Sequence, residues 1–259
     1  MKTFRDFNEK SLIEENYYKA RKNQTLDFIL KMKKKFSIFD KKMKIWDIFD
    51  KLNELIDISD PDCDIPNVYH ALQTAEKMRK DNLPDWFQLT GLIHDIGKIM
   101  FLKGNDTEGT GKNEQWAMVG DTFIIGSPLP NSLVYPEFNK ENSDAELDIY
   151  QKHCGLDNVH CSWGHDEYLY QILSYPKNEH SLPEEALYCI RFHSLYVYHD
   201  KNEYFQYQSE KDKKYFNILK QFNSYDLYSK SNEIFDINEL KPYYETLFKK
   251  YFKNNFLYI

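Results

Sequence analysis

Apolar residues recur along this chain every three or four positions, and runs in which apolar and polar residues alternate strictly are scarce. The spacing of three to four is typical of amphipathic α-helices, whereas strict alternation would indicate half-buried strands. A chain of 259 residues is also short enough to form one domain. We therefore predict an all-α protein, with a single helical domain over residues 1–259 and long loops.

Capping residues locate the expected helices. Asn67 is expected to cap a helix from Val68 to about Lys80, and Asp85, after Pro84, a helix from Trp86 to about Phe101. The other expected helices run from a Ser162 cap to about Leu173, from a capping box of Ser181 and Glu184 to about Tyr198, from Lys213 to Lys230, and from Pro242 to Phe252. Residues 104–155 are rich in Gly, Pro, Asn and Asp, and are expected to form a long loop with short pieces of helix or hairpin. Loops of that length often cover or bind a ligand.

The charge balance excludes some partners. A net charge of −7 and a pI near 5.7 argue against nucleic-acid binding, which relies on cations that neutralise phosphates. The basic runs at residues 31–35 and 41–44 are therefore interpreted as solvated helix surface. No apolar run is long enough to span a bilayer, and the opening MKTFRDFNEK lacks the apolar core of a signal peptide. We expect a cytoplasmic protein that binds neither nucleic acid nor membrane.

The cysteines do not suggest a disulfide scaffold or a thiolate metal site. The chain has four, with no CxxC pair: Cys63, Cys154, Cys161 and Cys189. Four cysteines are too few to cross-link a chain of this length, so we expect reduced thiols that mostly pack in the interior.

Histidines are the best indication of chemistry. His94 lies in GLIHDIGK, His165 in SWGHDEY and His193 in IRFHS. Because each helical residue turns about 100°, His165 shares a face with Tyr168, Leu169 and Ile172, which predicts that it points into the core. His193 similarly follows the stripe of Ala186, Ile190 and Val197.

Two aspartates have comparable positions. Asp226 follows the apolar stripe of Tyr215, Leu219 and Phe222, and a buried carboxylate requires a cation, a metal or strong donors. His94, Asp95 and Lys98 share one polar strip, with Thr90 and Gly91, on an otherwise apolar helix. His70 lies off the apolar stripe of its helix, but its place in the first turn allows it to face a neighbouring site.

Taken singly, each histidine is explained better as a hydrogen-bonded core residue than as a ligand. The set favours a metal site, because imidazole and carboxylate together suit iron, zinc or manganese. Two metals that share one carboxylate would use four histidines and two aspartates efficiently.

The order His70, His94–Asp95, His165, His193 and Asp226 resembles the ligand order of HD-domain proteins. The sequence around these residues is more specific for one family. The segments that look like myo-inositol oxygenase are DISDPDCDIPN, YHALQTAE, DWFQLTGLIHDIGK, QWAMVGDTF, SWGHDEYLYQ, IRFHS, FNSYDLYSK and PYYETLF. The resemblance to this family covers residues 4–252, and it implies an HD-domain-like helical bundle.

The resemblance also implies a ligand set and a substrate. One iron would be bound by His70, His94 and Asp226 and a second by His165 and His193, with Asp95 bridging a mixed-valent pair. Family positions that hold the polyol match Arg5, Asp57, Ile58, Ser59, Lys98, Gly120, Asp121, His193 and Ser194. The implied reaction cleaves the myo-inositol ring with O2 as cosubstrate and yields D-glucuronate, in a protein expected to be a monomer. Lys98 and Asp95 would be catalytic, with Lys98 stabilising negative charge on a substrate oxygen.

Other interpretations stay open at this stage. An HD-type phosphohydrolase would use the same ligands to activate water and clamp phosphate, although the motifs offer few cations beyond Lys98, Arg191 and Lys230. A helical binding module without catalysis is a second alternative, and the complete ligand set speaks against it. Outside the ligands, Lys98, Asp121, Ser194 and Arg5 also have ordinary structural explanations. One departure from the family is GNDTEGTGKNEQ at residues 104–115, which is longer than expected and predicts altered access to the site.

Overall fold

Helices carry most of the regular structure in the computed structural model, which describes residues 11–61, 66–229 and 235–259. The α-helices are α1 Ser11–Asn23, α2 Leu26–Phe36, α3 Ile45–Leu52, α4 Asn67–Lys80, α5 Asp85–Ile93, α6 His165–Ser174, α7 Glu184–Phe192, α8 Tyr196–His199, α9 Glu210–Tyr228 and α10 Ile237–Tyr251. Short 3-10 helices are η1 Ile96–Leu102, η2 Asp106–Glu108, η3 Pro136–Glu141, η4 Leu156–Asn158 and η5 Phe205–Tyr207. The predicted all-α class is confirmed.

Among the described residues, four short strands form two antiparallel pairs. β1 (Lys42–Lys44) pairs with β4 (Phe256–Tyr258), with Met43 opposite Leu257. β2 (Ile124–Ile125) pairs with β3 (His160–Cys161). The first pair joins the end of the described chain to the segment before α3, and the second closes part of the long loop.

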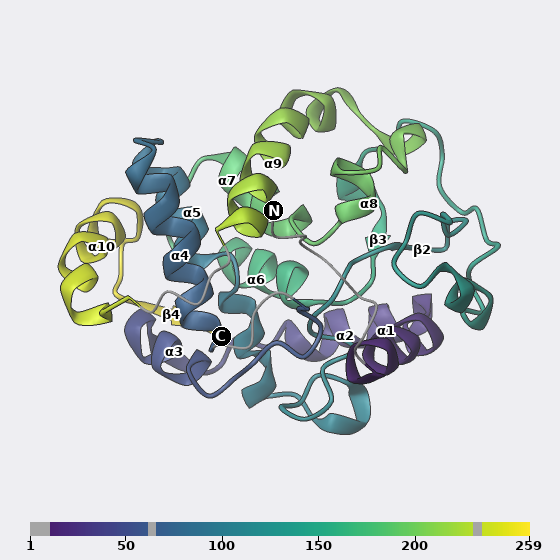
Figure 1. Cartoon of the computed structure of the whole chain (residues 1–259), viewed down its shortest axis with the longest axis horizontal. Helices are drawn as coiled ribbons and strands as arrows, with labels where there is room; N and C mark the ends of the chain where they lie inside the picture. Colours follow the sequence, from purple (N-terminus) through teal and green to yellow (C-terminus); the bar gives the residue numbers. More distant parts are fainter. Residues whose placement is uncertain (1–10, 62–65, 230–234) are drawn as a thin grey trace.

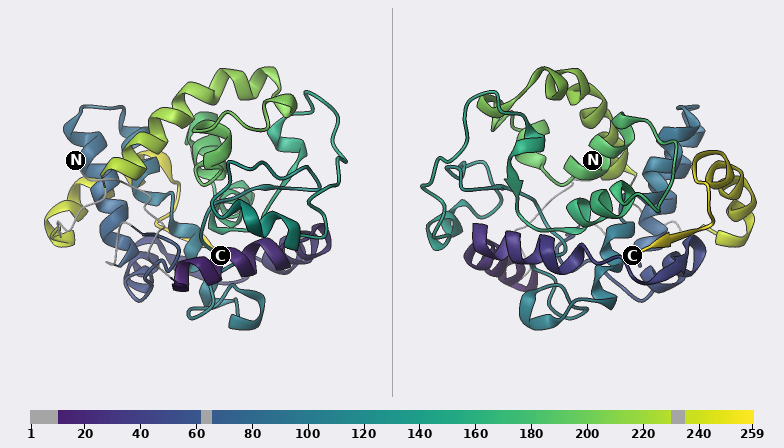
Figure 2. Two further views of the ribbon diagram at one scale, coloured as in Figure 1. Left: turned by 45° about the vertical axis from the view of Figure 1, so that its right-hand side comes forward. Right: turned by 180° about the vertical axis from the view of Figure 1, so that it is seen from behind.

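α6 lies in the interior of the molecule in Figure 1, between α9 above and α1 and α2 below. α6 contacts η1 and α7, α4 contacts α5 and α9, and α10 packs on α5. In the views of Figure 2, α9 crosses one side of the molecule, and α10 lies at its edge beside α4 and α5. One large cluster of buried side chains runs through these helices, from Ala20 to Ile259. Within the described ranges, no helix is both long and apolar enough to cross a membrane.

Several expected caps are wrong. Asn67 and Asp85 are the first residues inside α4 and α5, and the residues before them, Pro66 and Pro84, occupy the cap positions with extended ψ angles of 143° and 142°. α6 begins three residues after Ser162, and α7 begins after Pro183 without the predicted box. The ring of a proline fixes its φ angle, so Pro66 and Pro84 direct the chain into the helix without a side-chain hydrogen bond. The Ser162 hydroxyl instead accepts a hydrogen bond from the Phe123 backbone.

The helix expected from Trp86 to Phe101 is interrupted at the HD doublet. α5 ends at Ile93, and after His94 and Asp95 the chain continues as the 3-10 helix η1. A Cβ atom on Gly97 would lie only 1.8 Å from the His165 carbonyl oxygen, so the backbones of η1 and α6 approach as closely as glycine permits. The tighter helix brings residues three apart onto the same side, and this places Lys98 above Asp95. The helix expected to reach Tyr198 is likewise interrupted, between Phe192 and Tyr196.

Other elements differ from the expectations. Helices α1, α2 and α3 were not among the predicted set, although α2 buries Ile29, Met32 and Phe36 at helical spacing and is capped by Thr25. α9 begins at Glu210 with a capping box between Ser209 and Asp212, and α10 begins at Ile237. Lys230, the predicted end of α9, lies outside the described residues.

The loop, lysine and cysteine predictions have mixed outcomes. Between residues 104 and 155 the structure has only η2, η3 and β2, as predicted for a long loop with short elements. The lysines of residues 31–35 lie on α2, whereas residues 42–44 form strand β1 and not a helix. Cys154, Cys161 and Cys189 are free thiols, and Cys63 lies outside the described residues.

Candidate functional site

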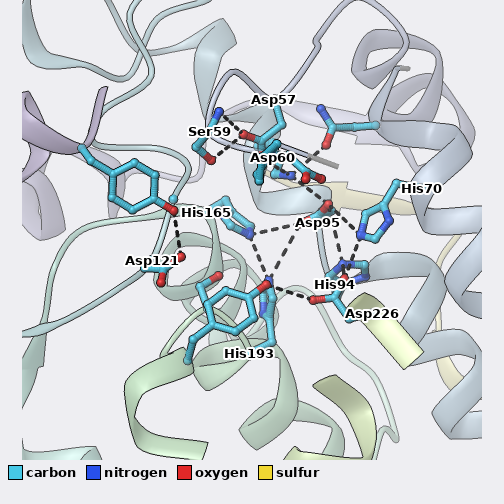
Figure 3. A pocket seen from close by; sticks show the side chains of 17 residues that line it. Asp57, Ser59, Asp60, His70, His94, Asp95, Asp121, His165, His193 and Asp226 are labelled. Carbon is cyan, nitrogen blue, oxygen red and sulfur yellow. Dashed lines mark hydrogen bonds and ion pairs between the residues drawn. The ribbon is translucent and has the colours of Figure 1, made fainter. Parts of the chain in front are cut away.

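Four histidines from four separate segments converge on one carboxylate (Figure 3). His70 comes from the first turn of α4, His94 follows α5, His165 opens α6 and His193 follows α7. All four are buried, with exposures of 1 to 7%. The stripe prediction that His165 and His193 point inward is confirmed, and His70, which lay off its stripe, faces the same place.

The Asp95 carboxylate lies between the two pairs of histidines. Its Oδ1 is 3.1 Å from His165 Nε2 and 3.9 Å from His193 Nε2. Its Oδ2 is 3.6 Å from His94 Nε2 and 3.9 Å from His70 Nε2. Each oxygen therefore faces a different pair, as a carboxylate shared between two metal ions would.

Asp226 joins only one of these pairs. Its side chain reaches in from α9, and its Oδ1 lies 2.8 Å from His70 Nε2 and 3.3 Å from His94 Nε2. Oδ2 accepts a hydrogen bond from the Tyr196 hydroxyl at 3.5 Å. The prediction that the Leu219 and Phe222 stripe carries Asp226 into the interior is confirmed, since all three are buried.

Backbone carbonyls orient three of the imidazoles. The Nδ1–H groups of His94, His165 and His193 donate to Gly91 O at 2.7 Å, Met118 O at 2.8 Å and Ile190 O at 2.8 Å. A ring that donates through Nδ1 keeps its Nε2 lone pair for another partner. His165 Nε2 and His193 Nε2 are 3.0 Å apart, so both lone pairs face one point.

The electrostatics keep the aspartates ionised and His193 neutral. Burial alone would raise the pKa of Asp95, but the Lys98 ammonium and the histidines hold it well below its usual range. Burial likewise opposes ionisation of Asp226, and His94 and His70 outweigh it and lower the pKa well below normal. For His193, burial and the neighbouring His165 and His94 lower the pKa far below 6.5. Ionised carboxylates and neutral imidazoles are the forms that bind metals.

Lys98 forms the other side of the site. Its ammonium donates to Asp57 Oδ2 at 2.8 Å, Asn67 Oδ1 at 2.8 Å and Asp95 Oδ2 at 2.9 Å. Burial alone would lower the pKa of Lys98, but the Asp57 and Asp95 carboxylates outweigh it and raise the pKa. Lys98 is therefore a cation that can donate and cannot serve as a base.

The pocket beyond these groups is polar. Of the predicted substrate contacts, the structure places Asp57, Ser59, Gly120, Asp121 and Ser194 on its wall, together with Lys98 and His193. Ile58 is not among the residues that line the pocket; its backbone N–H donates to Gln115. Arg5 lies outside the described residues.

Local contacts shape this wall. Asp57 Oδ1 accepts from the backbone and hydroxyl of Ser59, at 2.8 and 2.6 Å. Gly120 has a φ of +100°, a conformation that favours glycine, and the next turn is tied to Ser194 by a hydrogen bond from Thr122 N to Ser194 O at 2.9 Å.

Sequence reasoning missed five residues that line the pocket. They are Tyr17, Asp60, Pro61, Asn67 and Tyr196. The Tyr17 hydroxyl donates to Asp121 Oδ1 at 2.8 Å, although the two residues are 104 positions apart. No local pattern marks such a contact. Asn67 was assigned a capping role from its position before an apolar stretch, which concealed its place in the site.

The last residue of the segment 104–115 contacts the backbone beside Asp57. Gln115 donates from Nε2 to Ile56 O at 3.0 Å and accepts from Ile58 N at 3.3 Å. Its side chain thus holds the backbone on both sides of Asp57. The predicted effect of this segment on access to the site stays a prediction.

The donor set fits metal ions. Two groups, one of His70, His94 and Asp95 and the other of Asp95, His165 and His193, each bring their ligand atoms within 4.8 Å of one another. Imidazole nitrogen and carboxylate oxygen are ligands that first-row metals such as iron, manganese and zinc accept. The carbonyl contacts at Nδ1 are the supporting interactions usual for metal-bound histidine.

These features define a class: helical proteins with a buried histidine–aspartate site for metal ions. Comparisons narrow the class to one family. A sequence model described as "Myo-inositol oxygenase" matches residues 10–258. The chain is 44% identical to "Inositol oxygenase" of Dictyostelium discoideum over 97% of this chain and 88% of the relative. It is 42% identical to "Inositol oxygenase" of Danio rerio, over 96% of this chain and 90% of the relative, and 42% identical to that of Mus musculus, over 96% and 88%. The chain belongs to the myo-inositol oxygenase family, and it is an enzyme of the oxidoreductase class.

Proposed function

We propose that this protein cleaves the ring of myo-inositol with dioxygen and releases D-glucuronate. The observation that carries the proposal is the Asp95 carboxylate, which offers one oxygen to His165 and His193 and the other to His70 and His94. A site of this shape suits two metal ions that act on one substrate. The reaction balances as one polyol and one dioxygen giving one glucuronic acid and one water.

The proposed cofactor is a mixed-valent pair of irons. His70, His94 and Asp226 would hold one iron, His165 and His193 would hold the other, and Asp95 would bridge them. When bound, the irons would supply the redox chemistry that activates dioxygen. All six side chains are buried, so bulk water is kept from these positions.

Polar groups on the pocket wall orient the substrate. A polyol without charge is recognised through hydrogen bonds, and Asp57, Ser59, Asp121 and Ser194 supply donors and acceptors around the pocket. The Tyr17 hydroxyl holds Asp121 in place from α1. A Cβ atom on Gly120 would lie 3.7 Å from Ser59 Cβ and Tyr17 Cζ, so the absence of a side chain keeps this part of the wall open. Arg5 is proposed as a further contact from the family pattern alone.

Lys98 is the proposed electrostatic catalyst. Its ammonium lies 2.9 Å from Asp95 Oδ2, which places the positive charge at the edge of the histidine cluster. Negative charge that develops on a substrate oxygen beside it would be stabilised, and such a preorganised charge is most effective where water is excluded. Asp95 accepts from Lys98 and would hold the metal pair, so it would fix the position of both.

The pocket chemistry disfavours the phosphohydrolase alternative. Among the described residues that line the pocket, Lys98 is the only lysine or arginine. Its ammonium already contacts two carboxylates and an amide. A phosphate group would need several free cations at this point.

Metal analysis tests the proposal. We expect protein purified without oxygen to contain about two irons per chain, because the ligands form two partly open groups that share one carboxylate, and to give the spin-resonance spectrum of a coupled mixed-valent pair after partial oxidation. Protein that is active with one zinc and no iron would contradict it.

We further propose that the enzyme acts as a monomeric, single-domain cytoplasmic protein. The continuous core from Ala20 to Ile259 supports the single domain.

A further inference from the structure

The Lys98 ammonium has no hydrogen-bonding capacity left for a substrate. An ammonium carries three N–H donors, and Asp57, Asn67 and Asp95 accept one each, at 2.8, 2.8 and 2.9 Å. A substrate oxygen can therefore accept from Lys98 only if one of these contacts opens. The contact that opens determines which group of the substrate Lys98 can bind.

The contact with Asn67 is the weakest of the three. Asp95 is buried and the Asp57 side chain is only 15% exposed, so loss of their cation would leave a largely desolvated charge without its partner. Asn67 is neutral, and a hydrogen bond between an ammonium and an amide oxygen is weaker than one to a carboxylate. The Asn67 contact therefore costs least to exchange.

The Asn67 amide is held with its oxygen toward Lys98. Its Nδ2 donates to the Leu55 carbonyl at 3.0 Å, so Oδ1 is the end that meets the ammonium. The side chain is 3% exposed and lies on the wall of the pocket. An amide fixed in this way presents only its oxygen, a hydrogen-bond acceptor, to Lys98.

A hydroxyl group suits the exchange, because it can accept and donate at once. Placed between Lys98 Nζ and Asn67 Oδ1, it would accept from the ammonium and donate to the amide oxygen. Both protein groups would then keep a partner. A carbonyl or ether oxygen could accept from Lys98 but would leave the buried Asn67 oxygen without a donor, which is unfavourable.

We propose that a hydroxyl of the bound polyol inserts between Lys98 and Asn67, which makes Asn67 a substrate-binding residue that selects for a hydroxyl at that ring position. The proposal rests on the proposed function, since it takes myo-inositol as the ligand. Asn67 is thereby added to the substrate-binding residues. One particular hydroxyl is required for its hydrogen bond, and Asn67 does not contact the neighbouring hydroxyls of the ring.

A chemical double-mutant cycle tests the assignment. Binding of myo-inositol and of a set of monodeoxy-inositols is measured by calorimetry, without turnover, on wild-type protein and on Asn67→Ala. We expect the loss of one hydrogen bond to weaken myo-inositol binding to Asn67→Ala by about three- to tenfold. We expect wild-type protein to bind one deoxy analogue more weakly than myo-inositol by a similar factor. The affinity for this analogue should be the same in Asn67→Ala as in wild type.

Three variants serve as controls. Asn67→Asp turns this contact into an ion pair with Lys98, which costs more to open, so the advantage of myo-inositol over the deoxy analogue should shrink. Asn178→Ala removes an equally buried amide, which donates to Ile172 O and Tyr258 O away from the pocket, and should leave binding unchanged. If Asn67→Ala does not fold, Asn67→Leu makes the same comparison with the volume retained. Iron content and the far-ultraviolet spectrum show whether each variant keeps the native site.

Additivity would overturn the assignment: if every deoxy analogue loses as much affinity in Asn67→Ala as in wild type, Asn67 has no hydroxyl partner and only positions Lys98. Failure of the proposed function is a separate result. It would appear in wild-type protein as no oxygen uptake with myo-inositol, whatever the outcome for Asn67.

Discussion

Replacement of Lys98 by methionine should destabilise the metal-free protein. Lys98 is 4% exposed, and Lys98→Met keeps most of its aliphatic side chain but removes the ammonium, which donates to Asp57, Asn67 and Asp95. Removing one partner of a buried ion pair costs about 3–5 kcal/mol, because the remaining charge is left in the interior. Because the methionine also avoids the desolvation of an ammonium, we expect a loss near the lower end, about 3 kcal/mol.

Urea unfolding followed by far-ultraviolet circular dichroism measures this loss. A small domain has about 5–15 kcal/mol of stability in total, so a loss of this size should shift the midpoint clearly while the slope stays the same. Lys19→Met is the matched control: its ammonium pairs with Glu15 and Glu114, whose side chains are 56% and 38% exposed. An exposed pair contributes at most about 1 kcal/mol.

A Lys98→Met midpoint equal to that of wild type would refute this reasoning, because Asp57 and Asp95 would not depend on the ammonium. In the iron-loaded protein the same variant should retain iron and lose turnover by about a hundredfold or more, the usual effect of removing one preorganised electrostatic group. A variant with normal turnover would remove Lys98 from the catalytic account.

Two further predictions concern single carboxylates. Asp226→Asn should lose iron and activity but keep its helical spectrum, since Leu219 and Phe222 still pack; full iron content with normal turnover would make Asp226 structural only. Glu108→Gln tests a pH dependence. Lys31 and Lys35 lower the pKa of Glu108 from 4.5 to about 2, so its stabilisation is complete above 4.5 and is lost as the pH falls toward 2. In urea titrations, the free energy of unfolding of Glu108→Gln should be about 1 kcal/mol below that of wild type at pH 7. This difference should shrink below pH 4.5. A difference that does not depend on pH would contradict the ion-pair explanation.

Much of the buried site could be predicted from periodicity. His165, His193 and Asp226 each continue an apolar stripe, and a polar residue on such a stripe must turn inward wherever the helix packs. These predictions depended only on local geometry, and the structure confirms the burial of all three. Their roles as ligands rest on the family resemblance and remain proposals.

Contacts between distant segments could not be predicted in this way. The change from α5 to a 3-10 helix at His94 and Asp95 depends on Gly97 meeting the α6 backbone, which no local signal in GLIHDIGK announces. Tyr17 reaches Asp121 across 104 positions. Asn67 was misassigned because a side chain that precedes an apolar stretch can cap a helix or serve a site, and only its contacts with Leu55 and Lys98 distinguish the two.

The most direct test of the central claim is a joint measurement of oxygen uptake and product on iron-loaded protein. An oxygen electrode and a glucuronate assay are applied to the same sample with myo-inositol as the only substrate. The account predicts one dioxygen consumed for each glucuronate formed, with no external reductant required in the cycle. Release of phosphate from nucleotides without any uptake of oxygen would contradict it and would assign the same histidines and aspartates to a phosphohydrolase.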